Sequence, residues 1–338
     1  RALTAGFDPA AIVFSGVGKT DQEIEAALKA GVGQINVESE EELDAVIEVA
    51  RTLGIRAPVG IRVNPEVLVE VHPYTSTGER GKKFGVPFDE AGELGYRAWR
   101  TGELEFKGLG MHIGSGITSA GPFIEAVVKV LELVAELRGR GVDSMSTLDL
   151  GGGLGIRYHA DDRPLDVRDY AEALLPHVAT SRLFLLLEPG RFIVGEAGVL
   201  VTRVLYCKRS GGRAIAIVDA GMSDLIRPSH YDAYHEILVD RAHGRRRVVY
   251  DVVGPICESG DFLALDRELP EVRRGDLLAI QNAGAYGFTM ASTYNARPRP
   301  AELLVDEGRW AVVRQRETLD DLVRGEELEP AWRGDGRD

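Results

Sequence analysis

The sequence predicts an α/β fold of the (β/α)8 TIM-barrel type, followed by a C-terminal all-β domain. Roughly the first 190 residues alternate short aliphatic or β-branched runs with longer stretches of helical periodicity, which is typical of a parallel sheet. After about Gly195 the pattern changes to β-runs that are separated by glycine-bearing turns. We therefore expect a barrel domain over residues 1–195, a β domain over 196–330 and a frayed polar tail over 331–338.

Six runs in the first domain have the composition of parallel strands: 12–15, 34–37, 59–63, 108–113, 146–150 and 183–187. The last of them is wholly apolar, as expected for a strand that is buried on both faces. The amphipathic stretches between the strands predict helices over 21–30, 40–53, 89–100, 121–138 and 167–178. Since such a barrel closes with eight units, we expect two further βα units to precede Arg1.

The second domain contains six β-runs, over 199–206, 214–218, 248–253, 277–281, 302–305 and 310–316. Turn signals such as Gly211-Gly212 and Glu307-Gly308 separate several of them. This arrangement predicts an all-β second domain.

Charge and apolar run length argue against nucleic-acid and membrane partners. Acidic residues number 53 and basic residues 40, so the net charge is −13, which repels phosphate backbones. No apolar run approaches the length of about 18 residues that a bilayer-spanning helix needs. The two cysteines cannot form a disulfide framework, so we expect a reducing cytoplasm. Cys207, in a β-run, is expected to be buried and inert. Cys257 lies in a glycine-rich turn, where core packing does not explain the presence of a cysteine.

Three polar motifs follow predicted strands of the barrel domain. They contain His112 and Ser115, the glycines 151–153, and the Glu188-Pro189-Gly190-Arg191 segment. Because the carboxyl ends of parallel barrel strands form one face, we expect these motifs to converge on a single site. Exposed backbone N–H groups of the glycine triplet could close on an anionic oxygen.

Each motif also has a purely structural interpretation. His112 could be a satisfied core residue, the glycine triplet a tight turn, and Glu188 with Arg191 an internal ion pair. The segment 15–20 ends in Gly-Lys-Thr as phosphate loops do, but Val13 stands where that motif requires glycine, so we interpret it as a βα loop. The glycine triplet also lacks the spacing of a dinucleotide-binding loop.

Taken in order, these segments resemble the fold-type III pyridoxal-phosphate-dependent decarboxylases. The resemblance covers nearly the whole chain, from about Arg1 to Leu322, and its ordered motifs lie at 14–20, 72–74, 83–85, 112–115, 151–153, 188–191, 257–261 and 294–298. It implies an eight-stranded barrel, a C-terminal β domain, a pyridoxal phosphate cofactor and a homodimer. In such dimers the loop with the catalytic thiol comes from the second subunit.

The resemblance also implies roles for individual residues. His112 would stack on the pyridine ring, Glu188 would pair with the ring nitrogen, and Cys257 would return a proton to the substrate as general acid. The phosphate and ring would be held by Ser115, Gly152, Gly153, Glu188, Pro189, Gly190 and Arg191, with Tyr286 nearby.

The charges near these motifs favour a substrate with two amino-acid head groups. Arg191, Arg227 and Tyr231 could hold a distal carboxylate while Glu258 accepts the distal ammonium and Tyr286 lies close by. Family members that act on ornithine carry Asp after the catalytic cysteine, whereas Glu258 stands here. We therefore expect decarboxylation of meso-diaminopimelate to L-lysine, with a different amino acid such as ornithine or lysine as the alternative.

The sequence departs from the family at one important position. The family's cofactor-linking lysine lies in a Tyr-Ala-x-Lys-Ala-type strand near the N-terminus, and no such segment occurs among these 338 residues. Of the seven lysines only Lys19 follows a barrel strand, and the segment that carries it occurs in relatives that have the usual lysine as well. Met111 also stands where the family has a more polar residue. A catalytically inactive binding protein is therefore the rival hypothesis, although Cys257 and Glu258 argue against it.

Overall fold

The computed structural model describes residues 1–69, 72, 77–78, 80–330 and 332. Two compact units make up the chain, Arg1–Ile193 and Val194–Asp338, and each is described by itself below. Part of the motif at 72–74 and most of the predicted tail at 331–338 lie outside the described residues.

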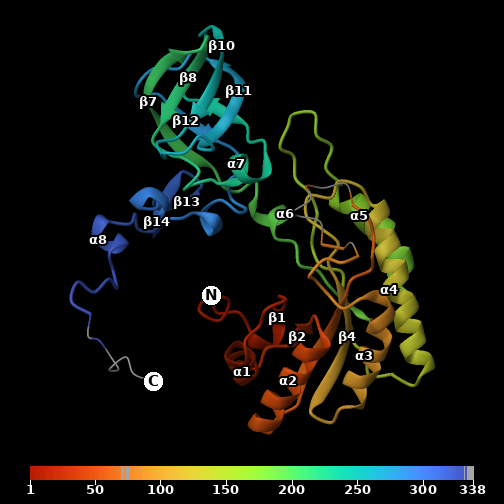
Figure 1. The fold of residues 1–338 in the computed structure, drawn as a ribbon. Helices are drawn as coiled ribbons and strands as arrows, with labels where there is room; N and C mark the ends of the chain where they lie inside the picture. The colour runs from red at the N-terminus through yellow and green to blue at the C-terminus, as the bar shows by residue number, and fades with distance from the viewer. Residues whose placement is uncertain (70–71, 73–76, 79, 331, 333–338) are drawn as a thin grey trace. The chain divides into compact units, whose positions relative to one another are not determined.

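The first unit is built on a parallel sheet whose six strands follow one another in chain order (Figure 1). Each strand pairs in parallel with the next, so the carboxyl ends of all six lie at one edge. This is the strand arrangement that the sequence predicts for a barrel. The strands are β1 (Val13–Phe14), β2 (Gln34–Val37), β3 (Ala57–Val63), β4 (Leu104–Met111), β5 (Thr147–Asp149) and β6 (Phe184–Leu186).

The predicted helices follow the strands, and their ends are fixed by local capping. The Thr20 hydroxyl accepts from the backbone N–H of Glu23, and the Glu23 carboxylate accepts from the backbone N–H of Thr20, which makes a capping box at the start of the first helix. Gly31 then ends that helix in the left-handed conformation. The helices are α1 (Asp21–Ala30), α2 (Glu40–Leu53), α3 (Phe88–Arg100), α4 (Gly121–Gly139), α5 (Val167–Val178) and α6 (Arg191–Val194), with a 3-10 turn η1 (Pro9–Ala11) before β1.

Burial in this unit falls off at its last strand. Ile35, Val37 and Ile61 in β2 and β3 are fully buried, as expected for strands covered on both faces. In contrast, Phe184 is 71% exposed and Leu187 is 52% exposed. The prediction that 183–187 is buried on both faces is therefore wrong, because β6 stands at one end of the strand order and pairs with β5.

The second unit is mostly β. Its six-stranded sheet has the order β11-β10-β8-β7-β12-β9, and β13 and β14 form a separate hairpin. The strands are β7 (Leu200–Ser210), β8 (Arg213–Val218), β9 (Ile237–Val239), β10 (Arg247–Val253), β11 (Phe262–Pro270), β12 (Leu277–Ile280), β13 (Glu302–Asp306) and β14 (Arg309–Arg314). Short helical segments lie between the strands, namely α7 (Arg227–Tyr231), η2 (Phe288–Met290) and η3 (Tyr294–Ala296), and α8 (Leu319–Leu322) follows β14.

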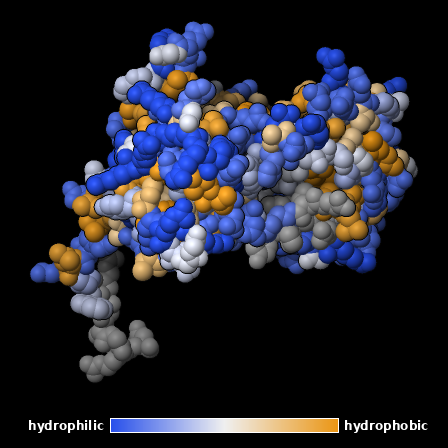
Figure 2. All heavy atoms as spheres, turned by 90° about the horizontal axis from the view of Figure 1, so that it is seen from above, coloured by the Kyte–Doolittle hydropathy of each residue, from blue (hydrophilic) through white to orange (hydrophobic). Residues whose placement is uncertain are grey.

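The surface is rich in polar side chains, in agreement with the many charged residues of the sequence (Figure 2). The face drawn in Figure 2 is mainly hydrophilic, with apolar patches between the charged side chains. Across the described part of the chain, no helix combines the length and the apolar character that crossing a membrane requires.

Candidate active site

The three polar motifs of the first unit come together at the carboxyl ends of β4, β5 and β6. The backbone N–H of Gly152 donates to Nδ1 of His112 at 3.1 Å. The backbone N–H of Glu188 donates to the carbonyl of Gly151 at 2.8 Å. Arg191 Nη2 donates to Ser115 Oγ at 3.1 Å. Neighbouring strand ends therefore hold one another through their loops.

The glycine triplet after β5 is required by its surroundings. Gly151 and Gly153 have φ angles of 66° and 108°, in the region that side chains disfavour. A Cβ on Gly152 would lie 2.2 Å from the carbonyl oxygen of Glu188, and one on Gly153 would lie 2.3 Å from that of Gly114. Larger residues would push the three loops apart, so the triplet is a cradle of bare backbone.

His112 presents a neutral imidazole to this cradle. Loss of hydration and the positive charge of Arg62 lower the pKa of His112 to about 4. Because Nδ1 accepts the hydrogen bond from Gly152, the proton of the neutral ring lies on Nε2. The ring is thus fixed in one tautomer and carries no charge near neutral pH.

Glu188 supplies a carboxylate at the same strand ends. Its surroundings partly exclude water, and the neighbouring charge of Asp149 adds repulsion, so the pKa of Glu188 is raised. The hydroxyl of Ser15, at the end of β1, donates to Glu188 Oε1 at 2.7 Å. Burial away from water is also the main reason that the pKa of Asp149 is raised. A cationic or N–H group near Glu188 would relieve both effects.

Arg191 is anchored on this side of the site. It is 9% exposed, and its Nη1 donates to the hydroxyl of Tyr158 at 2.7 Å while Nη2 donates to Ser115. These contacts fix the guanidinium plane beside the β4 and β5 loops.

Lys19 is held in the protein interior. Its side chain is 1% exposed, and Nζ lies 2.7 Å from Glu42 Oε1, with which it forms an ion pair. The same ammonium donates to the carbonyls of Gly16 at 2.6 Å and Asn36 at 2.7 Å. Three acceptors saturate the three N–H bonds of an ammonium, so Lys19 is a structural cation.

In the second unit, Cys257 and Glu258 lie on an exposed turn. Asp261 shapes this turn by accepting from the backbone N–H groups of Met222 and Ile256, each at 2.6 Å. The hydroxyl of Tyr294 donates to Glu258 Oε2 at 3.0 Å, and this bond raises the pKa of Tyr294. The turn thus presents a thiol and an oriented carboxylate to solvent.

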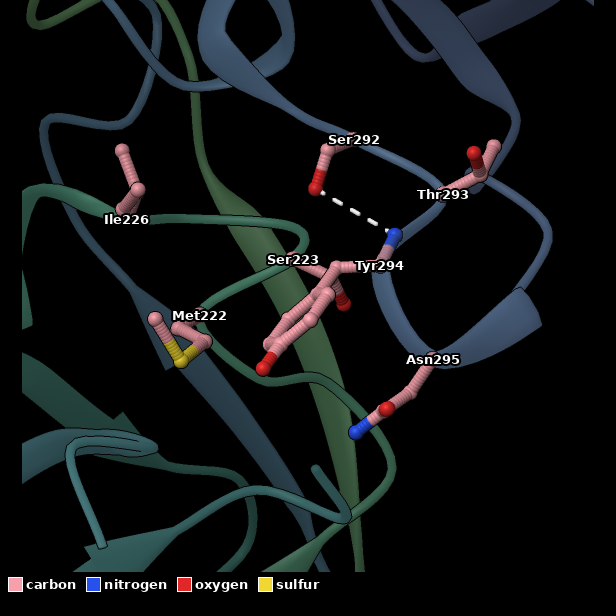
Figure 3. Close-up of a pocket in the computed structure, with 7 residues that line it drawn as sticks. All are labelled: Met222, Ser223, Ile226, Ser292, Thr293, Tyr294 and Asn295. Carbon is pink, nitrogen blue, oxygen red and sulfur yellow. Dashed lines mark hydrogen bonds between the residues drawn. The ribbon is translucent and has the colours of Figure 1, made fainter. Parts of the chain in front are cut away.

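A cavity of about 560 Å³ lies in the second unit beside Tyr294 (Figure 3). In Figure 3 the Tyr294 ring lies among the other labelled residues with its hydroxyl end toward Met222, and the backbone N–H of Tyr294 donates to Ser292 Oγ at 3.4 Å. The lining residues are Met222, Ser223, Ile226, Ser292, Thr293, Tyr294 and Asn295.

The other candidate residues of the second unit differ in exposure. Arg227 in α7 is buried, and its Nη1 lies 2.8 Å from Nε2 of fully buried His235. Tyr231 ends the same helix and is half-buried, while Tyr286 is 41% exposed with a φ of 58°. Cys207 is exposed, which corrects the expectation of a buried thiol: it lies in β7 beyond the part of that strand that is packed in the core.

Several site residues were not predicted from the sequence. The sequence pattern predicts only that Ser15 lies in a loop, and it indicates no role for Asn36, Asp149 or Tyr294. One signal was available: Gln34 and Asn36 are polar residues in an otherwise apolar strand, two positions apart and hence on one face. Within the described ranges, no group of three or more metal-binding side chains occurs.

Comparisons with known proteins agree with this geometry. A family model described as the pyridoxal binding domain of the pyridoxal-dependent decarboxylases matches residues 1–195. The chain is 49% identical over 330 residues to the diaminopimelate decarboxylase of Pseudomonas aeruginosa, covering 98% of this chain and 79% of that protein. This chain belongs to the diaminopimelate decarboxylase family. Its cofactor is therefore pyridoxal phosphate and its activity that of a carboxy-lyase, as the sequence predicted.

Solved structures of this family have the same fold. The diaminopimelate decarboxylase of Helicobacter pylori, complexed with L-lysine, has a TM-score of 0.91 and 44% identity, covering 96% of this chain and 80% of that one. The enzyme of M. jannaschii, in co-complex with L-lysine, has a TM-score of 0.92 and 37% identity, covering 97% and 77% of the two chains. These likenesses confirm the predicted fold class, a TIM-type barrel domain with a β domain.

The strand-end residues fit pyridoxal phosphate. Glu188 offers a carboxylate whose raised pKa a pyridine N–H would relieve, and His112 offers a flat uncharged ring. The glycine cradle offers bare backbone, and a Cβ on these glycines would collide with carbonyl oxygens of the neighbouring loops. These groups occur together at the strand ends of one unit, as a ring with an anionic tail requires.

Proposed function

We propose that this chain removes the carboxylate of one amino-acid head of meso-diaminopimelate, which gives L-lysine and carbon dioxide. The observation that carries this proposal is the joining of His112, the glycine cradle and Glu188 at neighbouring strand ends. The exposed Cys257-Glu258 turn supplies a proton donor, Cys257, and a carboxylate that selects the substrate, Glu258.

His112, Ser115, Gly152, Gly153 and the 188–191 segment (Glu188, Pro189, Gly190, Arg191) bind the cofactor in this proposal, with Tyr286 beside them. When bound, pyridoxal phosphate accepts the electron pair that remains on the substrate carbon as carbon dioxide leaves. Glu188 keeps the ring nitrogen protonated, because a cation beside the carboxylate offsets the partial dehydration that raises its pKa. His112 covers one ring face without adding charge.

Cys257 acts as the general acid. The bond between the α-carbon and its carboxylate breaks, and the thiol proton moves to that carbon, after which the thiolate takes a proton from solvent. The exposure of Cys257 suits this role, because a thiol on an open turn can both approach a substrate and regain a proton.

The substrate's distal head is recognised by groups of both signs. Arg191, Arg227 and Tyr231 bind its carboxylate, while Glu258 binds its ammonium and Tyr286 contacts the same end. The hydrogen bond from Tyr294 orients Glu258 for this task. An amine-ended substrate such as ornithine or lysine has no distal carboxylate for the arginines to bind.

We also propose that the active protein is a homodimer in the cytoplasm. The Cys257-Glu258 turn of one copy would serve the strand-end site of the other. Both cysteines are free thiols, which suits a reducing compartment and a thiol acid.

A substrate panel tests the proposal. The complete protein encoded by the gene is saturated with pyridoxal phosphate and incubated with meso-diaminopimelate, L-lysine or L-ornithine. Carbon dioxide and amine products are then measured. Diaminopimelate should be consumed at least a hundredfold faster than the others, because it alone offers a distal carboxylate that the arginines can bind. Equal turnover of ornithine would refute the substrate assignment, and cofactor binding without any turnover would favour the inactive binding protein.

A further inference from the structure

A chain of hydrogen bonds runs from buried side chains of the first unit to Glu188, which is exposed at the strand ends. Thr147 Oγ1 donates to Gln34 Oε1 at 2.8 Å, and Gln34 Nε2 donates to Asn36 Oδ1 at 2.7 Å. Asn36 Nδ2 donates to Ser15 Oγ at 3.0 Å, and Ser15 donates to Glu188 Oε1 at 2.7 Å. The chain thereby joins β5 and β2 to the loops that follow β1 and β6.

All the donors in this chain point the same way. Each group accepts from the one before it and donates to the next, so the series ends on an acceptor, the Glu188 carboxylate. Bonds arranged head to tail polarise one another in a low-dielectric interior. The arrangement therefore favours the ionised form of Glu188, against the dehydration and the Asp149 charge that oppose it.

Asn36 is the branch point. Its Nδ2 also donates to Asp149 Oδ2 at 2.9 Å, and the other Asp149 oxygen accepts from the backbone N–H of Gly151 at 2.9 Å. Asn36 is 2% exposed and Asp149 is 1% exposed, so neither group can exchange these bonds for water. One amide thus ties Glu188 and the glycine cradle to the same point in β2.

The neighbouring strands leave room for this chain. A Cβ on Gly60 of β3 would lie 2.5 Å from Gln34 Nε2 and 2.7 Å from Asn36 Oδ1. A Cβ on Gly110 of β4 would lie 3.1 Å from the Asp149 Cβ. Two glycines inside strands, where glycine is unfavourable, thus stand beside the polar chain.

We propose that Ser15 and Asn36 are positioning residues, which fix one oxygen of Glu188 so that the carboxylate meets the nitrogen of the cofactor ring. This inference rests on the proposed function, because it assigns the partner of Glu188. Other charges near Glu188 are Asp149, Glu38 and Arg62. Neither Ser15 nor Asn36 itself reacts.

Ser15→Ala removes the last donor of the chain and leaves Asn36 bonded to Asp149. Loss of one hydrogen bond to a charged group should weaken pyridoxal phosphate binding by about tenfold. Ser15→Thr keeps a hydroxyl and should restore binding to within about threefold of the parent value. Ser39→Ala is the matched control, because Ser39 is also a half-buried serine but caps α2. It should lower the unfolding midpoint and leave cofactor affinity unchanged.

The deciding experiment combines Ser15→Ala with Glu188→Ala in the gene-encoded polypeptide. Cofactor dissociation constants come from absorbance titration of pyridoxal phosphate, and thermal unfolding of each cofactor-free variant reports folding. If Ser15 acts through Glu188, Ser15→Ala should cost nothing further in the Glu188→Ala background. It should also shift the visible absorption of the bound cofactor when Glu188 is present.

The outcomes separate this inference from the function on which it rests. Parent-like affinity and absorption of the Ser15→Ala variant, or effects of the two substitutions that simply add, would overturn the positioning role alone. Failure of the parent protein to bind pyridoxal phosphate would overturn the proposed function as well.

Discussion

Replacing Lys19 by methionine should destabilise the first unit strongly while sparing the cofactor chemistry. The ammonium is 1% exposed and its partner Glu42 is 10% exposed, so the ion pair is withdrawn from water. Methionine fills a similar volume but leaves Glu42 charged and without its cation. Removing one partner of a buried ion pair costs about 3–5 kcal/mol.

A loss of about 4 kcal/mol corresponds to a factor of about a thousand in the folded-to-unfolded ratio, a large part of a typical domain stability. Urea unfolding can be followed through the fluorescence of Trp99 in α3, with Trp310 and Trp332 replaced by phenylalanine. Adding Glu42→Leu to Lys19→Met should recover much of the loss, because the stranded carboxylate is removed as well.

The result that would refute this reasoning is specific. If Lys19→Met lowered the free energy of unfolding by less than about 1 kcal/mol, the ion pair would contribute only as an exposed pair does. If it abolished pyridoxal phosphate binding in a protein of unchanged stability, Lys19 would be a cofactor residue.

Three further predictions concern the site. Cys257→Ala should lower kcat by about a hundredfold to ten-thousandfold and leave the cofactor dissociation constant unchanged, since it removes only a proton donor; equal losses in both quantities would contradict that role. Gly153→Ala should lower the unfolding midpoint and weaken cofactor binding, because φ is 108° and the new Cβ would lie 2.3 Å from the carbonyl oxygen of Gly114. Gly102→Ala, where no atom lies within 4 Å of the new Cβ, is its control. The pKa of His112 is 6.5 in the unfolded state and about 4 in the folded state, so on acidification the unfolded state takes up a proton at a higher pH than the folded state does. Stability should therefore fall as pH is lowered from about 6.5 to 4, by roughly 3 kcal/mol more than in His112→Gln. Parallel pH curves for the two proteins would contradict the lowered pKa.

The sequence predicted those elements whose signals are local. Helix α1 begins at Asp21 because Thr20 and Glu23 form a capping box, and it ends before Gly31, both readable from a few residues. The six strands of the first unit are short apolar runs between such helices. Strand β9 has only three residues and is defined by its pairing with β12, which no local pattern announces.

Strand β11 was missed for a related reason. Its burial alternates irregularly, and its pairing with β10 contains register shifts, so its sequence lacks a clean two-residue period. The exposure of Cys207 likewise depends on how far β7 extends beyond the core.

The candidate site was only partly readable from sequence. Motifs at strand ends could be expected to meet, because parallel strands place their carboxyl ends together. The bond between Ser15 and Glu188 joins residues 173 positions apart, and Asn36 reaches Asp149 across 113 positions. Such pairs follow from strand order and register, which a single sequence does not give.

The most direct test of the central claim is an absorbance titration of pyridoxal phosphate into the gene-encoded polypeptide and its Glu188→Gln variant, followed by addition of meso-diaminopimelate. The account predicts that both proteins bind the cofactor saturably. Only the parent should then decarboxylate the substrate at a substantial rate, and it should release one carbon dioxide for each lysine formed. It would be contradicted by a parent protein that binds no cofactor, or by a Glu188→Gln variant that decarboxylates as fast as the parent.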